Sequence, residues 1–333
     1  MIDAAIVGLG WWGKVLVNAI QGKSQKIRFV KATTRTLSNA EAFAREHRLE
    51  LVEGLDAILT DRKIDAVVLA TPHSHHAPQI IRTAEAGKHV MVEKPLTLTV
   101  ASARAAVQAA ERAGIVLALG YNRRFHPNMA ELHRWLKDGR VGTLLFCDCA
   151  LSAPNGRFLP RDTWRVDHGE APAGALTGLG VHAVDSIIDL FGEIEDVHCR
   201  SARRVVENDT GDTTIVSLAM KSGMIACVSC TIASTPSYRF AVYGSKGIVE
   251  ITKPTLDNLL FSPAPESALV PGSPAKMIKR PGYDTVRGIL EAFADSIDGI
   301  APFPISHNQM IHGVAAFEAI VRSAASGQVE RVL

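Results

Sequence analysis

The N-terminal stretch Ala4-Ala-Ile-Val-Gly-Leu-Gly-Trp-Trp-Gly13 decides the fold predicted for the first part of the chain. An apolar run of strand length breaks into Gly-x-Gly-x-x-Gly, and a helical pattern of apolar residues follows. A strand, a glycine turn and a helix in this order are the context that a dinucleotide-binding fingerprint requires. Gly8 then makes the tight turn, Gly10 lets the backbone approach a pyrophosphate, and Gly13 lets the helix pack against the strand. A bare structural turn is the alternative interpretation.

Length and composition limit the class of protein. With 333 residues the chain exceeds one compact core, so we expect two domains, residues 1–122 and residues 123–333. It is 47% hydrophobic and 21% charged, as ordinary globular proteins are, and its net charge of +2 with no basic run gives no reason to expect a nucleic-acid partner. No signal peptide is visible and no apolar stretch is long enough to span a bilayer, so we expect a cytoplasmic protein without a membrane partner.

The cysteines favour core packing over chemistry. Cys227 and Cys230 have the spacing of a zinc or redox pair, and Cys147 and Cys149 alternate along one strand, but both pairs lie in strand-like apolar runs. With Cys199 they form an odd set without a secretory context, so we expect reduced thiols packed as small apolar side chains.

From residue 27 to residue 119, strand-like segments alternate with helical segments. This pattern predicts an open, doubly wound parallel sheet of the Rossmann type, in which ligands bind outside the carboxyl ends of the strands. Loops 71–76, 93–95 and 121–124 follow such ends and are expected to line one crevice. Loop 71–76 carries His73, His75 and His76, but without zinc-ligand spacing, so we expect no metal there. The predicted cofactor-binding residues are Gly8, Gly10, Trp11, Trp12, Gly13, Thr34, Arg35, Thr71, Pro72, His73, His76, Glu93, Lys94, Pro95 and Asn122.

The end of the second strand bears on the choice of cofactor. NAD-binding proteins usually carry an acidic residue there for the ribose hydroxyls. Residues 30–36 contain none; Thr34 and Arg35 stand in its place, and an arginine suits a 2′-phosphate. We therefore favour NADP over NAD, with Arg35 as a solvated loop charge as the alternative.

Beyond residue 122 the pattern changes to consecutive strands. Strand-like segments between residues 142 and 251 are joined by short glycine-containing turns, which predicts an α+β domain with an open, mostly antiparallel sheet. Its apolar exposed face suggests a contact between subunits. Residues 261–282, with five prolines, are expected to form a surface excursion, and helices are expected over 285–297 and 309–325.

One helical segment of this region starts with glycines, which helices normally avoid. It runs from Gly174 to beyond Asp185 and carries His182 one turn before Asp185. We interpret its glycines as allowing close approach of a ligand to the backbone, and His182 as a catalytic rather than a structural histidine.

Four motifs together resemble the Gfo/Idh/MocA oxidoreductase family, which includes glucose–fructose oxidoreductase and inositol dehydrogenase. They are Gly8-Leu-Gly-Trp-Trp-Gly13, Glu93-Lys-Pro95, Gly120-Tyr-Asn-Arg-Arg-Phe125 and the helix from Gly174 to Asp185. The resemblance covers nearly the whole chain. It implies a Rossmann domain followed by a domain whose open sheet makes homodimers or homotetramers. It also implies that Lys94 and His182 are the catalytic lysine and histidine. The substrate-binding residues expected are Tyr121, Arg165, Gly178, His182 and Asp185.

Two positions depart from the family pattern. His73 stands where the loop usually has asparagine. Gly178, four residues before His182, stands where inositol dehydrogenase-like members carry an aspartate. Asp185 is the nearby carboxylate that could partly replace it, and the departure weakens the case for an inositol-type polyol.

The function predicted from sequence is an NADP-dependent dehydrogenase or reductase acting on a small molecule, namely a sugar, a polyol or a related hydroxylated ring. His182 is expected to act as general base and Lys94 to stabilise charge on the reacting oxygen. Two alternatives stay open. One is a glycosidase that retains its nucleotide for transient oxidation. The other is a nucleotide-sensing regulator without catalysis, for which the missing aspartate at Gly178 leaves room.

Overall fold

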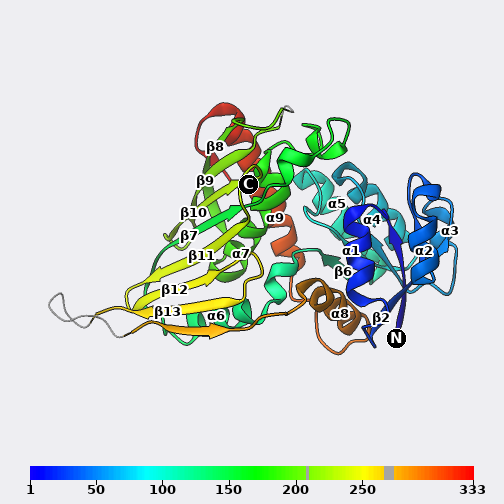
Figure 1. The fold of residues 1–333 in the computed structure, drawn as a ribbon, viewed down its shortest axis with the longest axis horizontal. Coiled ribbons are helices and arrows are strands. Elements are labelled where there is room, and N and C mark those ends of the chain that lie inside the picture. Colours follow the sequence, from blue (N-terminus) through cyan, green and yellow to red (C-terminus); the bar gives the residue numbers. More distant parts are fainter. Residues whose placement is uncertain (208–209, 266–273) are drawn as a thin grey trace. The chain divides into compact units, whose positions relative to one another are not determined.

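A computed structural model describes residues 1–207, 210–265 and 274–333. The chain divides into two compact units (Figure 1). The first comprises Met1–Asn122 and Asp284–Val314, and the second comprises Arg123–Tyr283 and Ala315–Leu333. The boundary at Asn122 coincides with the one expected from sequence. The segment Asp284–Val314, expected in the second domain, is part of the first unit because its helix packs on the first helix and second strand of the chain.

The first unit is a parallel Rossmann sheet with strand order β3-β2-β1-β4-β5-β6. The chain builds outward from β1 in both directions, so right-handed crossovers place α1 on one face and α4 and α5 on the other. Helix α8 packs against α1, and α4 packs against α5. The elements are β1 (Ile2–Val7), α1 (Trp11–Ile20), β2 (Ile27–Thr33), α2 (Glu41–His47), β3 (Glu50–Leu51), α3 (Asp56–Leu59), β4 (Ala66–Leu69), α4 (His76–Glu85), β5 (His89–Val92), α5 (Val100–Ala113), β6 (Leu117–Leu119), α8 (Thr285–Ile297) and α9 (His307–Ser326), which continues into the second unit.

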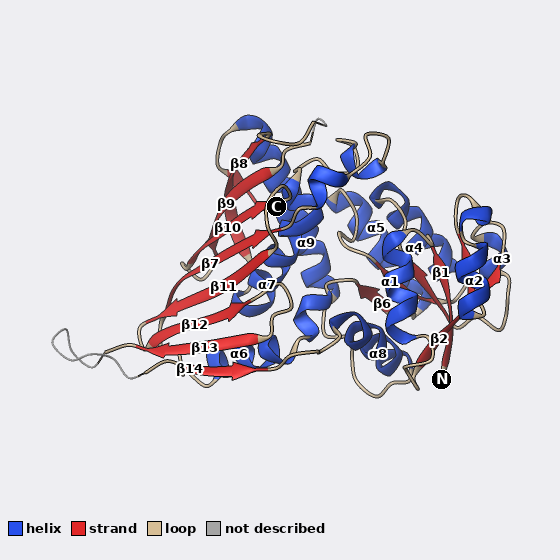
Figure 2. Ribbon diagram, viewed as in Figure 1, coloured by secondary structure: helices blue, strands red, loops and turns tan. Residues whose placement is uncertain are grey.

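The second unit is an open mixed sheet of nine described strands, in the order β14-β13-β12-β11-β7-β10-β9-β8-β15. Strands β7 and β10 pair in parallel and their neighbours pair antiparallel. Helices α6 and α7 lie on one face of this sheet (Figure 2). The elements are α6 (Pro127–Lys137), β7 (Leu144–Ser152), α7 (Val181–Phe191), β8 (Ile194–Ala202), β9 (Thr213–Met220), β10 (Ile225–Thr231), β11 (Ser237–Gly244), β12 (Gly247–Thr252), β13 (Asn258–Pro263), β14 (Lys276–Lys279) and β15 (Glu330–Arg331).

These two sheets confirm the predicted fold class. The expected surface excursion over residues 261–282 was wrong in part, because Phe261–Pro263 belong to β13 and Lys276–Lys279 form β14, which pairs with it. Residues 266–273 of that segment lie outside the described residues. The prolines misled the prediction since Pro263 ends its strand and Pro281 follows the next one, so neither interrupts a ladder.

The cysteines pack in the second unit as predicted. Cys147, Cys149, Cys199 and Cys230 are buried, and Cys227 is half-buried on the opposite face of the sheet. Burial raises the pKa of the Cys199 thiol to about 11 and that of Cys230 to about 12. Protonated thiols are poor nucleophiles and poor metal ligands, so these side chains act as small apolar residues. Among the described helices, none is long and apolar enough to cross a membrane.

Candidate active site

The predicted cofactor residues of the first unit gather at one edge of its sheet. Thr33, Val7, Leu69, Val92 and Leu119 are paired in register across β2, β1, β4, β5 and β6. The residue that follows each of them therefore stands at the same level, outside the carboxyl ends of the strands. These following residues begin the segments that carry Thr34 and Arg35, the glycine turn, Thr71, Glu93 with Lys94, and Tyr121.

The three fingerprint glycines lack a side chain for three different reasons. Gly8 has a φ of +99°, and a Cβ there would lie 2.5 Å from the carbonyl oxygen of Ala70. A Cβ on Gly13 would collide with the carbonyl oxygen of Gly8. The Cβ position of Gly10, by contrast, has no described heavy atom within 4 Å beyond its own neighbours and helix backbone. The open space lies at the start of α1, so the turn leaves room where helix N–H groups can bind a phosphate.

The nicotinamide dinucleotide implied by this motif fits the residues present. The first turn of α1 contains no acidic side chain, so nothing there repels a pyrophosphate. Trp11 is 66% exposed at this end, and its ring centroid lies 5.5 Å from that of the half-buried Trp12. Thr34 and the exposed Arg35 stand at the end of β2. The residues that would hold the pyrophosphate are those of the turn Gly8–Gly13.

His76 connects two of the loops at this edge. Its buried ring lies between two backbone carbonyls, with Nδ1 2.9 Å from the oxygen of Pro95 and Nε2 3.1 Å from the oxygen of Thr71. The ring of His73 meets it edge-on at 5.6 Å. The ring of His76 therefore fixes the loop after β4 to the segment that presents Lys94. Sequence predicted cofactor packing for this histidine and missed the link, because nothing in the local pattern relates residue 76 to residue 95.

Lys94 follows a buried strand end, as expected. The preceding Glu93 is buried, and its backbone N–H donates to the carbonyl of Leu69 at 2.9 Å. A Cβ on Gly120 would lie 2.9 Å from the Glu93 carboxylate, so the glycine lets this side chain lie against the end of β6. Lys94 is half-buried and joined to Pro95 by a cis peptide. Tyr121 is buried, and the amide of Asn122 donates to the Thr285 hydroxyl at 2.6 Å.

The remaining predicted residues lie in the second unit. The segment read as one helix is a short π-helix, Leu176–Gly180, that continues into α7. Gly178 is in the π-helix, and the half-buried His182 is in the first turn of α7. Arg165 lies in a separate turn, Trp164–Val166, with its guanidinium 4.2 Å from the centre of the Trp164 ring.

The glycines of this segment do not all serve a ligand. A Cβ on Gly174 would collide with the backbone of Gly211, and one on Gly180 would lie 2.9 Å from the sulfur of Cys230. The interpretation that these glycines allow a ligand to approach is therefore replaced, for these two, by contact with the protein itself. Of Gly174, Gly178 and Gly180, only Gly178 is exposed and open at its Cβ position.

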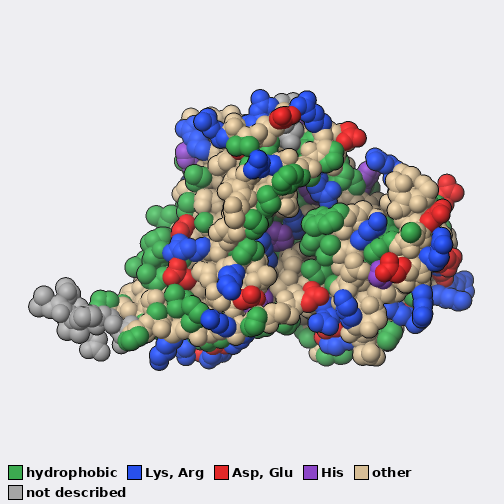
Figure 3. Space-filling model, viewed as in Figure 1, with side chains coloured by type: hydrophobic (Ala, Val, Ile, Leu, Met, Phe, Trp, Pro, Cys, Tyr) green, Lys and Arg blue, Asp and Glu red, His purple; other side chains and the backbone are tan. Residues whose placement is uncertain are grey.

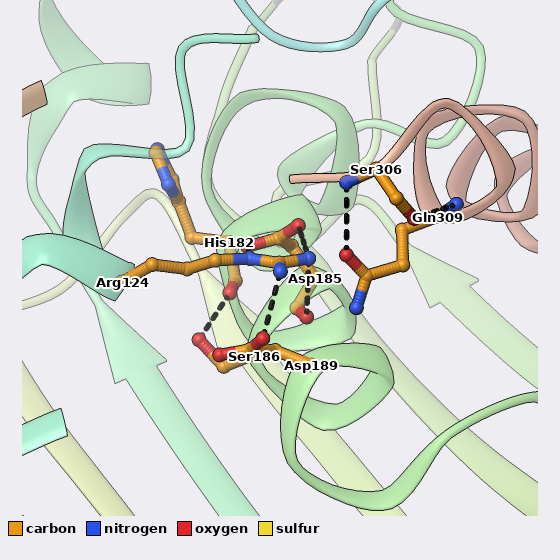
Figure 4. Close-up of polar contacts among 7 residues, drawn as sticks. All are labelled: Arg124, His182, Asp185, Ser186, Asp189, Ser306 and Gln309. Atoms are coloured by element: carbon orange, nitrogen blue, oxygen red, sulfur yellow. Dashed lines mark hydrogen bonds and ion pairs between the residues drawn. The ribbon is translucent and has the colours of Figure 1, made fainter. Parts of the chain in front are cut away.

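Asp185 and Asp189 bind a buried arginine that sequence reasoning did not single out. Arg124 forms a bidentate pair with Asp185, with Nε–Oδ2 and Nη2–Oδ1 distances of 2.8 and 2.6 Å, and its Nη1 lies 2.8 Å from Asp189 (Figure 4). Only 4% of the Arg124 side chain and 6% of that of Asp185 are exposed. The hydroxyl of Ser186 donates to the carbonyl of His182 at 2.9 Å. Arg124 thus fixes the face of α7 that bears Asp185 one turn after His182.

The burial of this pair sets the titration of Asp185. Burial raises the pKa of the carboxyl to about 6, although the charge and hydrogen bonds of Arg124 act to lower it. The negative charge of Asp189 raises it further. Since both carboxylate oxygens bind Arg124, the Asp185 side chain has a structural role, which is to anchor α7.

The ion pair predicts a large loss of stability for Arg124→Met. Removing one partner of a buried pair leaves an uncompensated charge, which costs about 3–5 kcal/mol in the free energy of unfolding. The conservative Asp189→Asn change keeps the bidentate pair and is expected to cost about 1 kcal/mol. Urea unfolding of both variants and the wild type measures these differences. Equal losses in the two variants would contradict the assignment.

The same measurement has an expected pH dependence. The pKa of Asp185 in the folded protein lies above its ordinary value of 3.8, so its stabilising contribution is present at low pH and is lost as the pH rises to about 6. Without Arg124 this loss extends to higher pH. The difference between the wild type and Arg124→Met is therefore expected to be larger at about pH 8 than at about pH 5.

Comparison with known proteins identifies the family of both parts of the chain. Residues 2–121 match the oxidoreductase family with an NAD-binding Rossmann fold, and residues 129–250 match the GFO/IDH/MocA C-terminal domain. Inositol 2-dehydrogenase of Rhizobium meliloti is 32% identical over 252 residues, which is 73% of each chain. The 1,5-anhydro-D-fructose reductase of Ensifer adhaerens is 25% identical over 100% of this chain and 97% of its own.

Solved structures show the same fold over the whole length. A levoglucosan dehydrogenase in complex with NADH and levoglucosan superposes with a TM-score of 0.87 at 21% identity, covering 100% of this chain and 99% of its own. The resemblance stated from sequence is confirmed. The chain belongs to the Gfo/Idh/MocA family and is an oxidoreductase with an NAD-binding Rossmann domain.

Proposed function

We propose that this oxidoreductase transfers hydride between a nicotinamide cofactor and a carbon bearing a hydroxyl or keto oxygen in a sugar, a polyol or a related ring. The observation that carries the proposal is the sheet edge of the first unit. There the open glycine turn at Gly10 and the segment bearing Lys94 follow strands paired in one register. A cationic side chain beside a dinucleotide site suits charge stabilisation on an oxygen next to the hydride-transferring carbon.

Two side chains have catalytic roles in the proposed reaction. The cofactor supplies a hydride acceptor at its nicotinamide ring. In the oxidative direction His182 accepts the proton of the substrate hydroxyl as general base, since an imidazole titrates near neutral pH. Lys94 donates a hydrogen bond to the same oxygen and stabilises the negative charge that develops on it. In the reductive direction His182 returns the proton.

The proposed substrate class follows from the relatives and from Gly178. The relatives described above are named for inositol, 1,5-anhydro-D-fructose and levoglucosan, which are all polyhydroxylated rings. Tyr121, Arg165, Gly178 and His182 are the substrate residues that we propose. Asp185 is left out because both its carboxylate oxygens bind Arg124. It therefore does not replace the aspartate that inositol dehydrogenase-like members carry in place of Gly178.

For the cofactor we propose NADP. The end of β2 carries no carboxylate that would repel a 2′-phosphate, and Arg35 there is exposed. The hydroxyl of the adjoining Thr33 accepts the backbone N–H of Gly54 at 3.1 Å, which orders the end of the strand. NAD is the alternative outcome of the measurement given below.

We also propose that the outer face of the second unit's sheet binds a second copy of this chain in a homodimer or homotetramer. Tyr243, Phe146 and Ile225 lie side by side on β11, β7 and β10. Phe146 stacks on Tyr243 at 4.0 Å, and Phe146 and Ile225 are 41% and 58% exposed. Figure 3 shows hydrophobic side chains at the surface over these strands. A self-complementary apolar row of this kind suits a two-fold contact between copies.

The catalytic assignment predicts that Lys94→Met lowers kcat by about 100- to 1000-fold, the effect of losing a donor to a developing oxyanion. His182→Asn is expected to lower kcat by about 100- to 10,000-fold through loss of the general base. Cofactor affinity is expected to change far less in His182→Asn, because that residue is outside the Rossmann unit. Steady-state kinetics and nucleotide titration measure both quantities. Lys63→Met, which removes an exposed lysine of the first unit, is the control. Unchanged turnover in Lys94→Met would refute the assignment.

The cofactor assignment predicts that Arg35→Ala weakens NADPH binding by about 10- to 100-fold, the value of one charge-assisted hydrogen bond, with little effect on NADH. Titrations that follow quenching of the tryptophans near the turn measure both affinities. Arg45→Ala, an exposed arginine on α2, is the matched control. If the wild type bound NADH more tightly than NADPH, the cofactor would be NAD.

The oligomer proposal predicts that Ile225→Asp dissociates the protein, because a charge would be buried without a partner in the contact. Ile300→Asp makes the same change at a residue that is 69% exposed in the first unit, and is expected to leave the assembly intact. Sedimentation equilibrium measures the mass of each variant. A monomeric wild type, or an Ile225→Asp variant of unchanged mass, would contradict this contact.

A further inference from the structure

Asp212 is a buried carboxylate that the proposed reaction does not use. It lies between β8 and β9 and has no exposed surface. Its Oδ2 accepts three backbone N–H groups, from Arg204 at 2.8 Å, Val205 at 2.6 Å and Val206 at 3.0 Å. Its Oδ1 accepts the hydroxyl of Thr213 at 2.9 Å. The carboxylate therefore holds the backbone of residues 204–206, which follow β8, around one of its oxygens.

The electrostatics suit an ionised side chain at this point. Burial raises the pKa of Asp212, but the hydrogen bonds from Val205, Val206 and Arg204 lower it further, and the net pKa is below its ordinary value. The side chain is thus a carboxylate at neutral pH, and hydrogen bonds to a charged acceptor are stronger than those to a neutral one.

The backbone of Asp212 is fixed on both sides. Its N–H donates to the carbonyl of Ala202 at 2.9 Å, and its own carbonyl accepts the N–H of Ile232 at 2.9 Å. Ala202 ends β8, and Ile232 follows β10. Asp212 is consequently held between β8 and the end of β10, and the first of these bonds fixes the peptide that joins it to Gly211.

Gly211 connects Asp212 to the start of the π-helix. Its carbonyl accepts the N–H of Ala175 at 2.8 Å, immediately before Leu176–Gly180. The two backbones touch, because a Cβ on Gly174 would collide with Gly211, and one on Gly211 would collide with the hydroxyl of Ser201. Gly174 also has a φ of +53°, which favours glycine.

A second set of hydrogen bonds connects β9 to the start of the π-helix. The hydroxyls of Ser201 and Thr214 are 3.1 Å apart, and that of Thr214 donates to the carbonyl of Ala173 at 3.4 Å. The N–H of Ala173 in turn donates to the hydroxyl of Thr177 at 3.2 Å, inside the π-helix. The start of the π-helix is thus hydrogen-bonded to Gly211, just before Asp212, and to Thr214, two residues after it.

We propose that Asp212 is a positioning residue for the reaction: its carboxylate holds residues 204–206 against the backbone at Asp212, so that the adjoining Gly211 stays in place to bind the start of the π-helix and thereby sets the position of His182 in the next turn. Asp212 touches neither substrate nor cofactor in this proposal. Its effect on turnover rests on the proposed role of His182 as general base, whereas its effect on the π-helix does not.

The test compares Asp212→Ala, Asp212→Asn and Ser323→Ala in the full chain. Asparagine can still accept the three N–H groups through Oδ1 and donate to Thr213 through Nδ2, so it is the conservative rescue. Ser323→Ala is the matched structural control. The hydroxyl of Ser323 accepts the N–H of Cys199 on β8 at 2.8 Å and donates to the carbonyl of Gln328 at 2.5 Å, so its bonds join β8 to the end of α9. The loss of a buried acceptor destabilises the same strand in both alanine variants.

Two readouts are measured. Hydrogen–deuterium exchange followed by mass spectrometry reports on the peptide that contains Ala175 and His182. We expect faster exchange in Asp212→Ala only. Steady-state kinetics are expected to show a kcat reduced by about 10- to 100-fold in Asp212→Ala, since a misplacement of about 1 Å costs up to that much. Nucleotide affinity is expected to be unchanged, kcat largely restored in Asp212→Asn, and Ser323→Ala like the wild type.

The outcomes separate this proposal from the proposed function. Unchanged exchange in Asp212→Ala, or a kcat equal to that of Ser323→Ala, would overturn the positioning role. A nucleotide affinity that falls as much as kcat in Asp212→Ala would overturn it too, because it would show general destabilisation. A wild type without nicotinamide-dependent turnover would refute the proposed function alone, and exchange would still decide whether Asp212 orders the π-helix.

Discussion

Backbone contact at positions where no Cβ fits is the constraint on which both halves of the site depend. In the first unit the carbonyl of Ala70 lies where a side chain of Gly8 would be, and the carbonyl of Gly8 lies where one of Gly13 would be. In the second unit the same relation joins Gly174 to Gly211. Each contact fixes the start of a helical segment, α1 in one case and the π-helix in the other. Of these glycines only Gly13 is inside a helix, where glycine costs about 1 kcal/mol relative to alanine, and there it trades local stability for a defined helix start.

The sequence predicted the first unit well because its signals are local. A strand, a glycine turn and a helix are contiguous in residues 2–20, and the hydrophobic period alternates regularly up to β6. Helix α8 begins and ends at the predicted residues, and the carboxylate of Asp284 caps its start. Once the strands are parallel, the register alone brings the loops after them to one edge. The segment Asp284–Val314 was misassigned because its packing on α1 is not a local property.

The contacts that hold the π-helix and α7 in the second unit could not be predicted from sequence, because they too are not local. Arg124 is separated by 61 residues from Asp185. Gly211, which precedes Asp212, accepts a hydrogen bond from Ala175, which is also distant in the sequence. An arginine among seven within residues 123–165 is ordinarily a solvated charge, and an aspartate before a strand is ordinarily a turn residue. What distinguishes both is burial with paired hydrogen bonds, which only the three-dimensional structure reveals.

Gly10 and Gly178 differ from the other glycines of the two site segments. Neither has a described heavy atom within 4 Å of its Cβ position beyond its own neighbours and helix backbone, so a side chain would fit at either position. At Gly10 the space lies at the N-terminus of a helix, where the N–H groups can bind a phosphate. Gly178 is exposed four residues before His182, and its open Cβ position gives no steric reason for the cost of a glycine in the helix. By the same reasoning we propose that this open space serves the substrate, so that a substrate group, rather than a carboxylate of the protein, would lie there beside the proposed general base.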